Sequence, residues 1–234
     1  MTVWDAHMKA IVFTRYGSPE GLELMDVPRP EPMTNDLLVR VHASSINSWD
    51  WEYLNGTPFI NRLMFGLFKP KRGKQRLGAD IAGTVEAVGR DVTRFQPGDE
   101  VFGDLWDKWG GFAEFACTDE IAVERKPGNL SFEEAAGVPQ AGVLALQALR
   151  RVGQINPGDE VLINGAGGGV GTFAIQLAKL FSAEVTGVDA AHKFGTVRDA
   201  GAVQVIDYVQ QNFTSTGSSY DLIVDCQGTR PMSS

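Results

Sequence analysis

Five glycines stand between an apolar run and an amphipathic one in residues 164–179, NGAGGGVGTFAIQLAK. Within this stretch Ala166, Gly168 and Gly171 have the spacing A-x-G-x-x-G, directly after the apolar run EVLIN. A backbone without side chains can approach a phosphate closely, and the free N–H groups at the start of a helix bind its charge. The spacing therefore predicts a strand-to-helix turn that holds the pyrophosphate of a dinucleotide. We expect contacts from Ala166, Gly167, Gly168, Gly169, Val170 and Gly171.

The same glycines also allow a second pattern. Gly165, Gly169 and Gly171 satisfy G-x-x-x-G-x-G, the spacing of short-chain dehydrogenases, which carry it near the N-terminus and need a catalytic Tyr-x-x-x-Lys. No tyrosine of this chain has a lysine four residues later; the tyrosines are Tyr16, Tyr53, Tyr208 and Tyr220. The first pattern is therefore preferred.

An acidic residue, Asp189, ends the apolar run AEVTGVD, about twenty residues beyond the glycines. A carboxylate at this position binds the ribose hydroxyls of NADH and repels the 2′-phosphate of NADPH. Lys193 follows four residues later, and an ammonium there would offset the repulsion. The residues therefore leave NADH and NADPH as alternatives.

The glycine turn lies in a region where short apolar runs alternate with helical ones. From residue 159 the order is strand, helix, strand, helix, ending in the apolar run YDLIVDC. Short apolar strands interleaved with helices predict a parallel sheet that is buried on both faces. This half is therefore expected to be an α/β nucleotide-binding domain.

The first half of the chain has a different pattern. From residue 8 to about residue 126, short alternating or β-branched runs are broken by Pro and Gly, which predicts a β-rich domain. Ser131 and Glu134 have capping-box spacing and begin a linking helix that we expect to reach about residue 151. We therefore predict a β domain at residues 8–130 and the α/β domain at residues 131–234, with the first seven residues as an extension.

Charge and cysteine content limit the partners to expect. The net charge of −8 repels nucleic acids and anionic membranes, so we expect a small-molecule partner, no nucleic acid and no membrane. In such an acidic chain we interpret the basic run KPKRGKQR, residues 69–76, as a solvated loop. Two cysteines without CxxC spacing form no disulfide framework, and no apolar run reaches the roughly 18 residues of a membrane span. We therefore predict a cytoplasmic location.

The glycines belong to a longer set of residues that includes Gly158, Asp159, Leu162, Gln176 and Lys179. This set resembles the signature of the quinone oxidoreductases, the zeta-crystallin-like branch of the medium-chain dehydrogenase/reductase superfamily. The resemblance extends over nearly the whole chain, through MKAIVF, LLVRVHASSIN, LGADIAGTVEAVG, FQPGDEVFG and GAVQVIDY. It implies a GroES-like β-barrel domain followed by a Rossmann domain, with the active site in the cleft between them.

The resemblance also locates the zinc-ligand positions of the related alcohol dehydrogenases. In this chain they hold Asn47, Ala79, Asp80 and Gln140. One carboxylate and two amides make a poor zinc site, so we expect no metal. Without a Lewis acid an alcohol is hard to oxidise, whereas a quinone or an α,β-unsaturated carbonyl accepts hydride directly. The resemblance therefore implies NADPH- or NADH-dependent reduction of a quinone or enone.

Several side chains near the substrate are implied by the same resemblance. Asn47 would be a polar group that faces nicotinamide and substrate. Asp50 would order the loop that carries Asn47, or serve only as a helix cap. Tyr53 would donate a proton in the same site. Tyr208 matches a tyrosine that lies near the adenosine end of the cofactor, and His42 is interpreted as structural.

The end of the sequence bears on activity. In the strand order 3-2-1-4-5-6 we expect this chain to supply strands 3, 2, 1 and 4 and to lack the last two. Strand 4 would then be an exposed apolar edge that favours pairing, and a homodimer is one way to cover it. Two alternatives to an active reductase therefore stay open: an inactive dinucleotide-binding fragment, and a non-enzymatic partner-binding module.

Overall fold

The computed structural model describes residues 7–71, 73, 75–106, 108–215 and 217–228 of the 234-residue chain. The chain divides into two compact units, Met1–Gln140 and Ala141–Ser234. The division follows Gln140, so residues 131–140, which the sequence assigned to the second domain, lie with the first unit. Each unit is described separately below.

The first unit is built from antiparallel strands. A two-stranded sheet pairs β1 (His7–Phe13) with β2 (Leu22–Pro28). A five-stranded sheet has the order β6-β3-β4-β5-β7; its strands are β3 (Asp36–Ser44), β4 (Asp80–Val88), β5 (Glu100–Asp104), β6 (Phe115–Asp119) and β7 (Val123–Arg125). Apolar side chains from these strands, among them Leu37, Ile81 and Val101, are fully buried and form the core. The predicted β-rich domain is confirmed.

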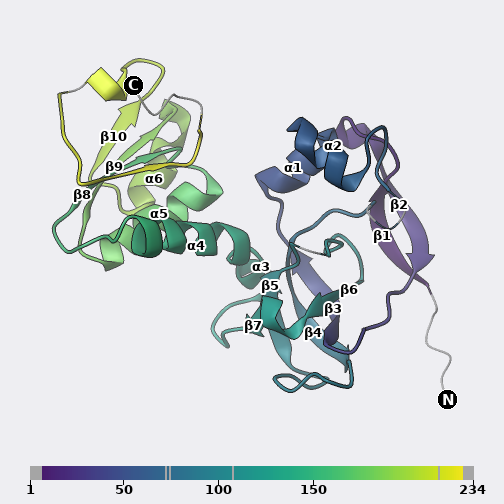
Figure 1. Ribbon diagram of the computed structural model, residues 1–234. Coiled ribbons are helices and arrows are strands. Elements are labelled where there is room, and N and C mark those ends of the chain that lie inside the picture. The colour runs from purple at the N-terminus through teal and green to yellow at the C-terminus, as the bar shows by residue number, and fades with distance from the viewer. Residues whose placement is uncertain (1–6, 72, 74, 107, 216, 229–234) are drawn as a thin grey trace. The chain divides into compact units, whose positions relative to one another are not determined.

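Two helices interrupt this unit between β3 and β4. They are α1 (Ser48–Asn55) and α2 (Phe59–Phe65), which lie together outside the five-stranded sheet (Figure 1). A separate cluster of buried aromatic and aliphatic residues, including Phe13, Tyr53 and Trp109, packs beneath α1. The helices therefore have a core of their own, apart from that of the five-stranded sheet.

The predicted linking helix is present in three pieces. They are α3 (Phe132–Ala136), α4 (Pro139–Leu146) and a π-helical turn, Gln147–Val152. The capping box forms as predicted, because Ser131 N donates to Glu134 Oε2 at 2.8 Å and Glu134 N donates to Ser131 Oγ at 3.2 Å. Gly137 and Pro139 separate α3 from α4, since glycine and proline weaken a continuous helix.

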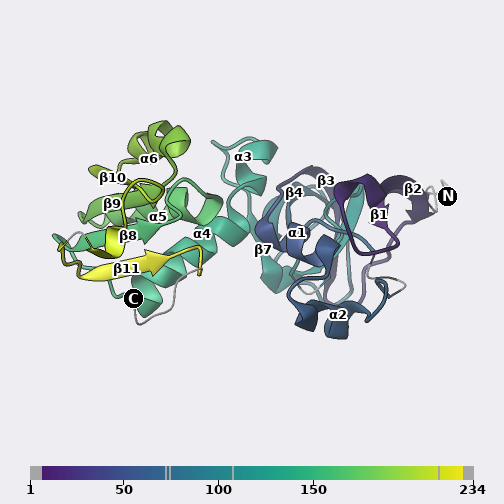
Figure 2. The ribbon, with the colours of Figure 1, turned by 90° about the horizontal axis from the view of Figure 1, so that it is seen from above.

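The second unit is a parallel sheet with helices. Its order is β10-β9-β8-β11, and every neighbouring pair is parallel (Figure 2). The elements are β8 (Glu160–Asn164), α5 (Gly169–Leu180), β9 (Glu184–Asp189), α6 (Phe194–Ala200), β10 (Gln204–Asp207) and β11 (Leu222–Asp225). Fully buried residues of β8 and α5, such as Ile163 and Ile175, form its core. The predicted order 3-2-1-4 is confirmed, with β10, β9, β8 and β11 in those places.

Candidate cofactor and substrate sites

The glycine turn connects β8 to α5 and is tied to the neighbouring strand. The N–H groups of Gly165 and Ala166 both donate to the carbonyl of Val188, at 2.9 and 3.1 Å. Gly165 has a φ of +82°, a left-handed conformation that glycine adopts without a Cβ penalty. The turn is therefore fixed on the carboxyl ends of β8 and β9, where nucleotides bind in sheets of this order.

The start of α5 lies directly against this turn. A Cβ on Gly171 would overlap the carbonyl oxygen of Gly165 and come within 2.7 Å of Ala166 Cα, so only glycine allows this approach. Gly168 is the N-cap and has no side chain with which to cap the helix. The N–H groups of the first turn, residues 169–171, have no acceptor four residues earlier within the helix. They form an anion-binding position at the positive end of the helix dipole.

Asp189, at the end of β9, is 5% exposed and bonds to the glycine turn. Its Oδ2 accepts a hydrogen bond from Gly167 N at 2.8 Å, and its Oδ1 accepts one from Ala190 N at 2.8 Å. Lys193 Nζ lies 3.6 Å from Asp189 Oδ1, and a Cβ on Gly167 would come within 2.9 Å of the Lys193 side chain. The structure therefore brings together the glycines, the acidic residue and the lysine that the sequence singled out.

A cavity of about 300 Å³ opens beside this group. Its lining includes three predicted residues, Asp189, Lys193 and Tyr208. The remaining lining residues were missed from the sequence: Asn164, Gly165, Phe213 and Gln227. Asn164 ends β8 and Gln227 follows β11, so their places at the carboxyl ends of neighbouring strands were a usable signal.

Both cysteines are half-buried thiols. Burial raises the pKa of Cys226 to about 11, with a further contribution from the Asp225 carboxylate. Burial also raises the pKa of Cys117 to about 11, and Asp36 adds to the effect. Cys226 lies close to the glycine turn, because its Cβ would be 3.3 Å from a Cβ placed on Gly165. Lys108, Arg76 and Arg29 lower the pKa of Cys117, but burial and Asp36 outweigh them, so neither thiol has the lowered pKa of a reactive cysteine.

In the first unit, Asp50 holds the segment before α1 to the segment before β4. Its Oδ2 accepts a hydrogen bond from Asn47 N at 2.8 Å, and its Oδ1 accepts one from Gly78 N at 2.8 Å. Burial raises the pKa of Asp50, and the N–H groups of Asn47 and Gly78 act in the opposite direction. Both carboxylate oxygens therefore accept hydrogen bonds from backbone N–H groups. The bond from Asn47 belongs to the cap of α1, and the bond from Gly78 orders the chain before β4.

Asn47 and Asp80 share a hydrogen-bonded network at the start of α4. Asn47 Nδ2 donates to Asp80 Oδ2 and to Ser45 Oγ, each at 3.1 Å. Ser45 Oγ donates to Asp80 Oδ2 at 3.1 Å, and Gln140 N lies 3.2 Å from both Asp80 carboxylate oxygens. Burial raises the pKa of Asp80 to about 6, against the hydrogen bonds from Asn47 and Gln140, and Asp104 raises it further.

This network joins three of the positions that bind zinc in alcohol dehydrogenases. Zinc sites in proteins use thiolates, imidazoles and carboxylates, whereas here Asn47 Nδ2 and Gln140 N direct their hydrogens at the carboxylate of Asp80. Among the described residues, no group of three or more His, Cys, Asp or Glu side chains is arranged to hold a metal ion. The side chains at these positions do not fit a zinc ion.

Tyr53 lies in the aromatic core rather than at a surface. It is 1% exposed, and its ring packs edge-to-face on Phe13 with centroids 5.2 Å apart. The rings of Phe65 and Trp109 lie 4.3 and 4.9 Å from it. Burial raises the pKa of Tyr53 well above its ordinary value. In this conformation its contacts are those of a core side chain.

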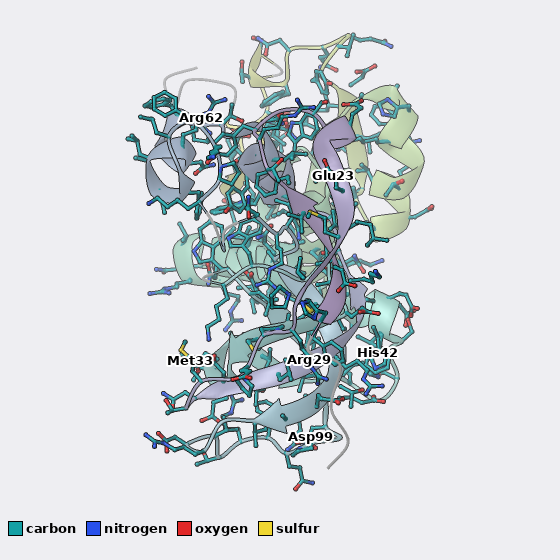
Figure 3. All side chains as sticks on the ribbon, turned by 90° about the vertical axis from the view of Figure 1, so that its right-hand side faces the viewer. Glu23, Arg29, Met33, His42, Arg62 and Asp99 are labelled. Atoms are coloured by element: carbon teal, nitrogen blue, oxygen red, sulfur yellow. The ribbon has the colours of Figure 1, made fainter. Side chains whose placement is uncertain are left out.

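His42 lies on β3 with its ring exposed (Figure 3). Its Nε2 is 3.0 Å from Thr84 Oγ1, and its ring stacks 4.3 Å from Phe132. These contacts join β3, β4 and the start of α3. They are consistent with the structural role that the sequence suggested.

Comparison with known proteins places these features in a family. Residues 33–148 match the family described as alcohol dehydrogenase GroES-like domain. The chloroplastic quinone oxidoreductase QR1 of Triphysaria versicolor is 34% identical over 97% of this chain and 70% of its own length. The 2-methylene-furan-3-one reductase of Solanum lycopersicum is 34% identical over 95% of this chain and 58% of its own length.

Solved structures of quinone oxidoreductases are also similar to this chain. The quinone oxidoreductase of Coxiella burnetii has a TM-score of 0.85 and 36% identity, covering 94% of this chain and 68% of that protein. The Escherichia coli quinone oxidoreductase in complex with NADPH has a TM-score of 0.77 and 29% identity, covering 87% of this chain and 60% of that protein. This chain thus spans about 58–70% of the lengths of these proteins. The chain belongs to the quinone oxidoreductase (zeta-crystallin-like) branch of the medium-chain dehydrogenase/reductase superfamily.

Proposed function

We propose that this protein is an NAD(P)H-dependent reductase of quinones or α,β-unsaturated carbonyls that works without zinc. The observation that carries the proposal is the glycine turn, with the open helix start of α5 and the cavity lined by Asp189, Lys193 and Tyr208. The names of the relatives from Triphysaria and Solanum support the substrate class, and the NADPH complex of the Escherichia coli protein supports the cofactor class.

In this proposal the second unit binds and orients the dinucleotide. The N–H groups of residues 169–171 bind the pyrophosphate, and Asp189 and Lys193 face the adenosine ribose. When bound, the reduced nicotinamide supplies a hydride to the substrate, and a solvent proton completes the reduction. Tyr208 borders the adenosine side of the cavity.

The first unit contributes the polar groups near the substrate. Asn47 is the polar contact, held by Asp80 and Ser45 through its amide N–H groups. Asp50 is a positioning residue, since both of its oxygens bind backbone N–H groups. Tyr53 supports α1 from the core, and its phenol is too well buried in this conformation to donate a proton to a substrate.

A charge substitution at the start of α5 tests cofactor binding directly. Gly169 is exposed, and a Cβ there would meet only Ala141 Cβ, at an ordinary 3.7 Å. Gly169→Asp places a carboxylate in the first turn, which stabilises the helix but repels the pyrophosphate. We expect at least about a tenfold loss of NADPH affinity in a fluorescence titration.

The matched control is Gly195→Asp, in the first turn of α6, where a Cβ meets nothing within 4 Å. It should leave NADPH affinity unchanged. Equal affinities in the two variants would refute the pyrophosphate site. If the purified chain binds NADPH but oxidises it with neither a naphthoquinone nor an enone, the reductase proposal fails and the inactive dinucleotide-binding fragment is supported.

The choice between NADH and NADPH is tested at Asp189. Asp189→Ser keeps an oxygen that accepts from Gly167 N but removes a charge worth roughly 3 kcal/mol against a phosphate about 5 Å away. We expect the ratio of NADPH to NADH affinity to rise at least about tenfold. Asp221→Ser, whose carboxylate accepts from Glu160 N at the other end of the sheet, is the control. An unchanged ratio would mean that Asp189 does not face the ribose.

Location and assembly stay predictions. The Triphysaria relative is chloroplastic, so kinship gives no support to a cytoplasmic location. A homodimer is likewise a prediction, made from the exposed sheet edge, and sedimentation of the purified chain tests it. The absence of nucleic-acid partners is a prediction from net charge.

A further inference from the structure

Six large apolar side chains are exposed in and directly after α2. They are Phe59 (63%), Ile60 (54%), Leu63 (55%), Met64 (57%), Leu67 (43%) and Phe68 (88%), here called the α2 patch. Phe59, Leu63 and Leu67 are spaced four residues apart, and so are Ile60, Met64 and Phe68. Within α2 this spacing places Phe59 beside Leu63 and Ile60 beside Met64, and Leu67 and Phe68 follow the end of the helix at Phe65. Exposed apolar area of this kind marks an interaction site.

The α2 patch is held in place from its inner side. Phe65 packs on the buried ring of Tyr53, and Tyr16 Oη donates to the carbonyl of Gly66 at 2.7 Å. Arg62, labelled in Figure 3, donates to the carbonyls of Gly56 and Asn55 at 3.1 and 3.2 Å. The exposed apolar side chains therefore belong to a segment that is anchored to the rest of the first unit.

Charge is distributed unevenly around the α2 patch. Residues 53–79 contain six Lys or Arg and no Asp or Glu, in a chain whose net charge is −8. Arg62 bonds inward to backbone carbonyls, whereas Lys69, next to Phe68, and Lys71 are exposed, so cationic groups border the α2 patch. Of the predicted basic loop at residues 69–76, positions 72 and 74 lie outside the described residues.

We propose that the α2 patch docks on the surface of an anionic lipid bilayer. Exposed Phe and Leu beside Lys and Arg are the side chains by which peripheral proteins enter a membrane interface, the apolar groups inserting shallowly and the cations pairing with lipid phosphates. A second copy of the chain is a poorer occupant, because a twofold contact would place two basic segments against each other.

This inference revises the expectation of no membrane partner, which rested on net charge and on the lack of an apolar run of membrane-spanning length. Electrostatic attraction acts within about 10 Å at ordinary ionic strength, so the local excess of Lys and Arg decides the sign at this surface. Nowhere in the described residues is a helix long and apolar enough to cross a bilayer, so the contact is interfacial.

Vesicle sedimentation tests the proposal with the purified chain. Vesicles of phosphatidylcholine alone are compared with vesicles of phosphatidylcholine and phosphatidylglycerol in equal parts. We expect binding to the mixed vesicles, weakened by salt, and weaker binding to phosphatidylcholine alone. Phe68→Ser should reduce binding to the mixed vesicles by about tenfold or more, and Lys69→Glu should reduce it while leaving the weak binding to phosphatidylcholine unchanged.

Two matched variants control for surface change in general. Ile121→Ser removes an apolar side chain that is 79% exposed, and Arg90→Glu reverses a charge on a side chain that is 80% exposed, both away from the α2 patch. Circular dichroism verifies that each variant is folded. No binding to either vesicle, or equal losses in control and patch variants, overturns the proposal. A dimer that Phe68→Ser dissociates, without vesicle binding, overturns it in favour of a second copy.

Discussion

Asp80 is a buried carboxyl group that accepts hydrogen bonds from several neutral donors. The amide of Asn47, the hydroxyl of Ser45 and the N–H of Gln140 all point at it, yet burial still raises its pKa to about 6. Hydrogen bonds from neutral donors offset only part of the cost of removing a charge from water. At any pH at which Asp80 is ionised, it therefore orders Asn47 at a cost in the stability of the folded state.

This cost should be visible as a pH dependence of stability. The pKa of Asp80 is raised on folding, so the folded state binds more protons than the unfolded state between about pH 4 and pH 6. Stability from this group is present below the unfolded pKa and is lost as pH rises through about 6, by about 3 kcal/mol at most. We expect urea unfolding to show this decline in the parent chain and a smaller one in Asp80→Asn, where Asp50, whose pKa burial also raises, still contributes.

Asp99→Asn is the control, because the hydrogen bond from Arg125 lowers the pKa of the Asp99 carboxyl, so its effect falls below this pH range. It should leave the decline between pH 4 and pH 6 in place. A decline of the same size in Asp80→Asn would mean that another group titrates there.

At the residue scale, local spacing indicated which residues lie together, whereas contacts between distant segments left little signal in the sequence. The glycines, Asp189 and Lys193 could be found because one turn and one strand end place them, at spacings set by backbone geometry. The convergence of Asn47, Asp80 and Gln140 was suggested only by kinship, since they come from three separate segments. The burial of Tyr53 had no local signal either, because Phe13 and Trp109, which cover it, are distant in sequence.

At the scale of elements, the contact between α5 and the glycine turn fixes the second unit. Helix α5 lies so close to the turn that Gly171 leaves no space for a methyl group. The strand order could be predicted because apolar strands and amphipathic helices alternate clearly after residue 159. The break between α3 and α4 was not predicted, although Gly137 and Pro139 were visible, since a capping box and apolar spacing favoured one continuous helix.

A methyl group at this contact should be costly. Gly171→Ala forces α5 away from the backbone of Gly165, and overpacking of this kind costs about 1–3 kcal/mol or more. Gly195→Ala, in open space on α6, should be neutral or stabilise by up to about 1 kcal/mol. Urea unfolding followed by far-ultraviolet circular dichroism measures both. Equal stabilities would refute the close approach.

At the scale of the whole molecule, the two units can be observed separately. All five tryptophans lie in residues 1–140 and none in residues 141–234, so tryptophan fluorescence reports on the first unit alone. Each unit has its own buried core. The Gly171→Ala transition should therefore shift less when followed by fluorescence than when followed by circular dichroism.

The two half-buried thiols have a consequence for durability. Quinones and enones are electrophiles that alkylate thiolates, and an enzyme that handles them is exposed to arylation by its own substrate. A thiol with a pKa of about 11 is ionised in roughly one molecule in ten thousand at pH 7. Cys226, close to the glycine turn, and Cys117 should therefore react slowly with a quinone or enone, so that under the proposed function the chain is protected from inactivation by its own substrate.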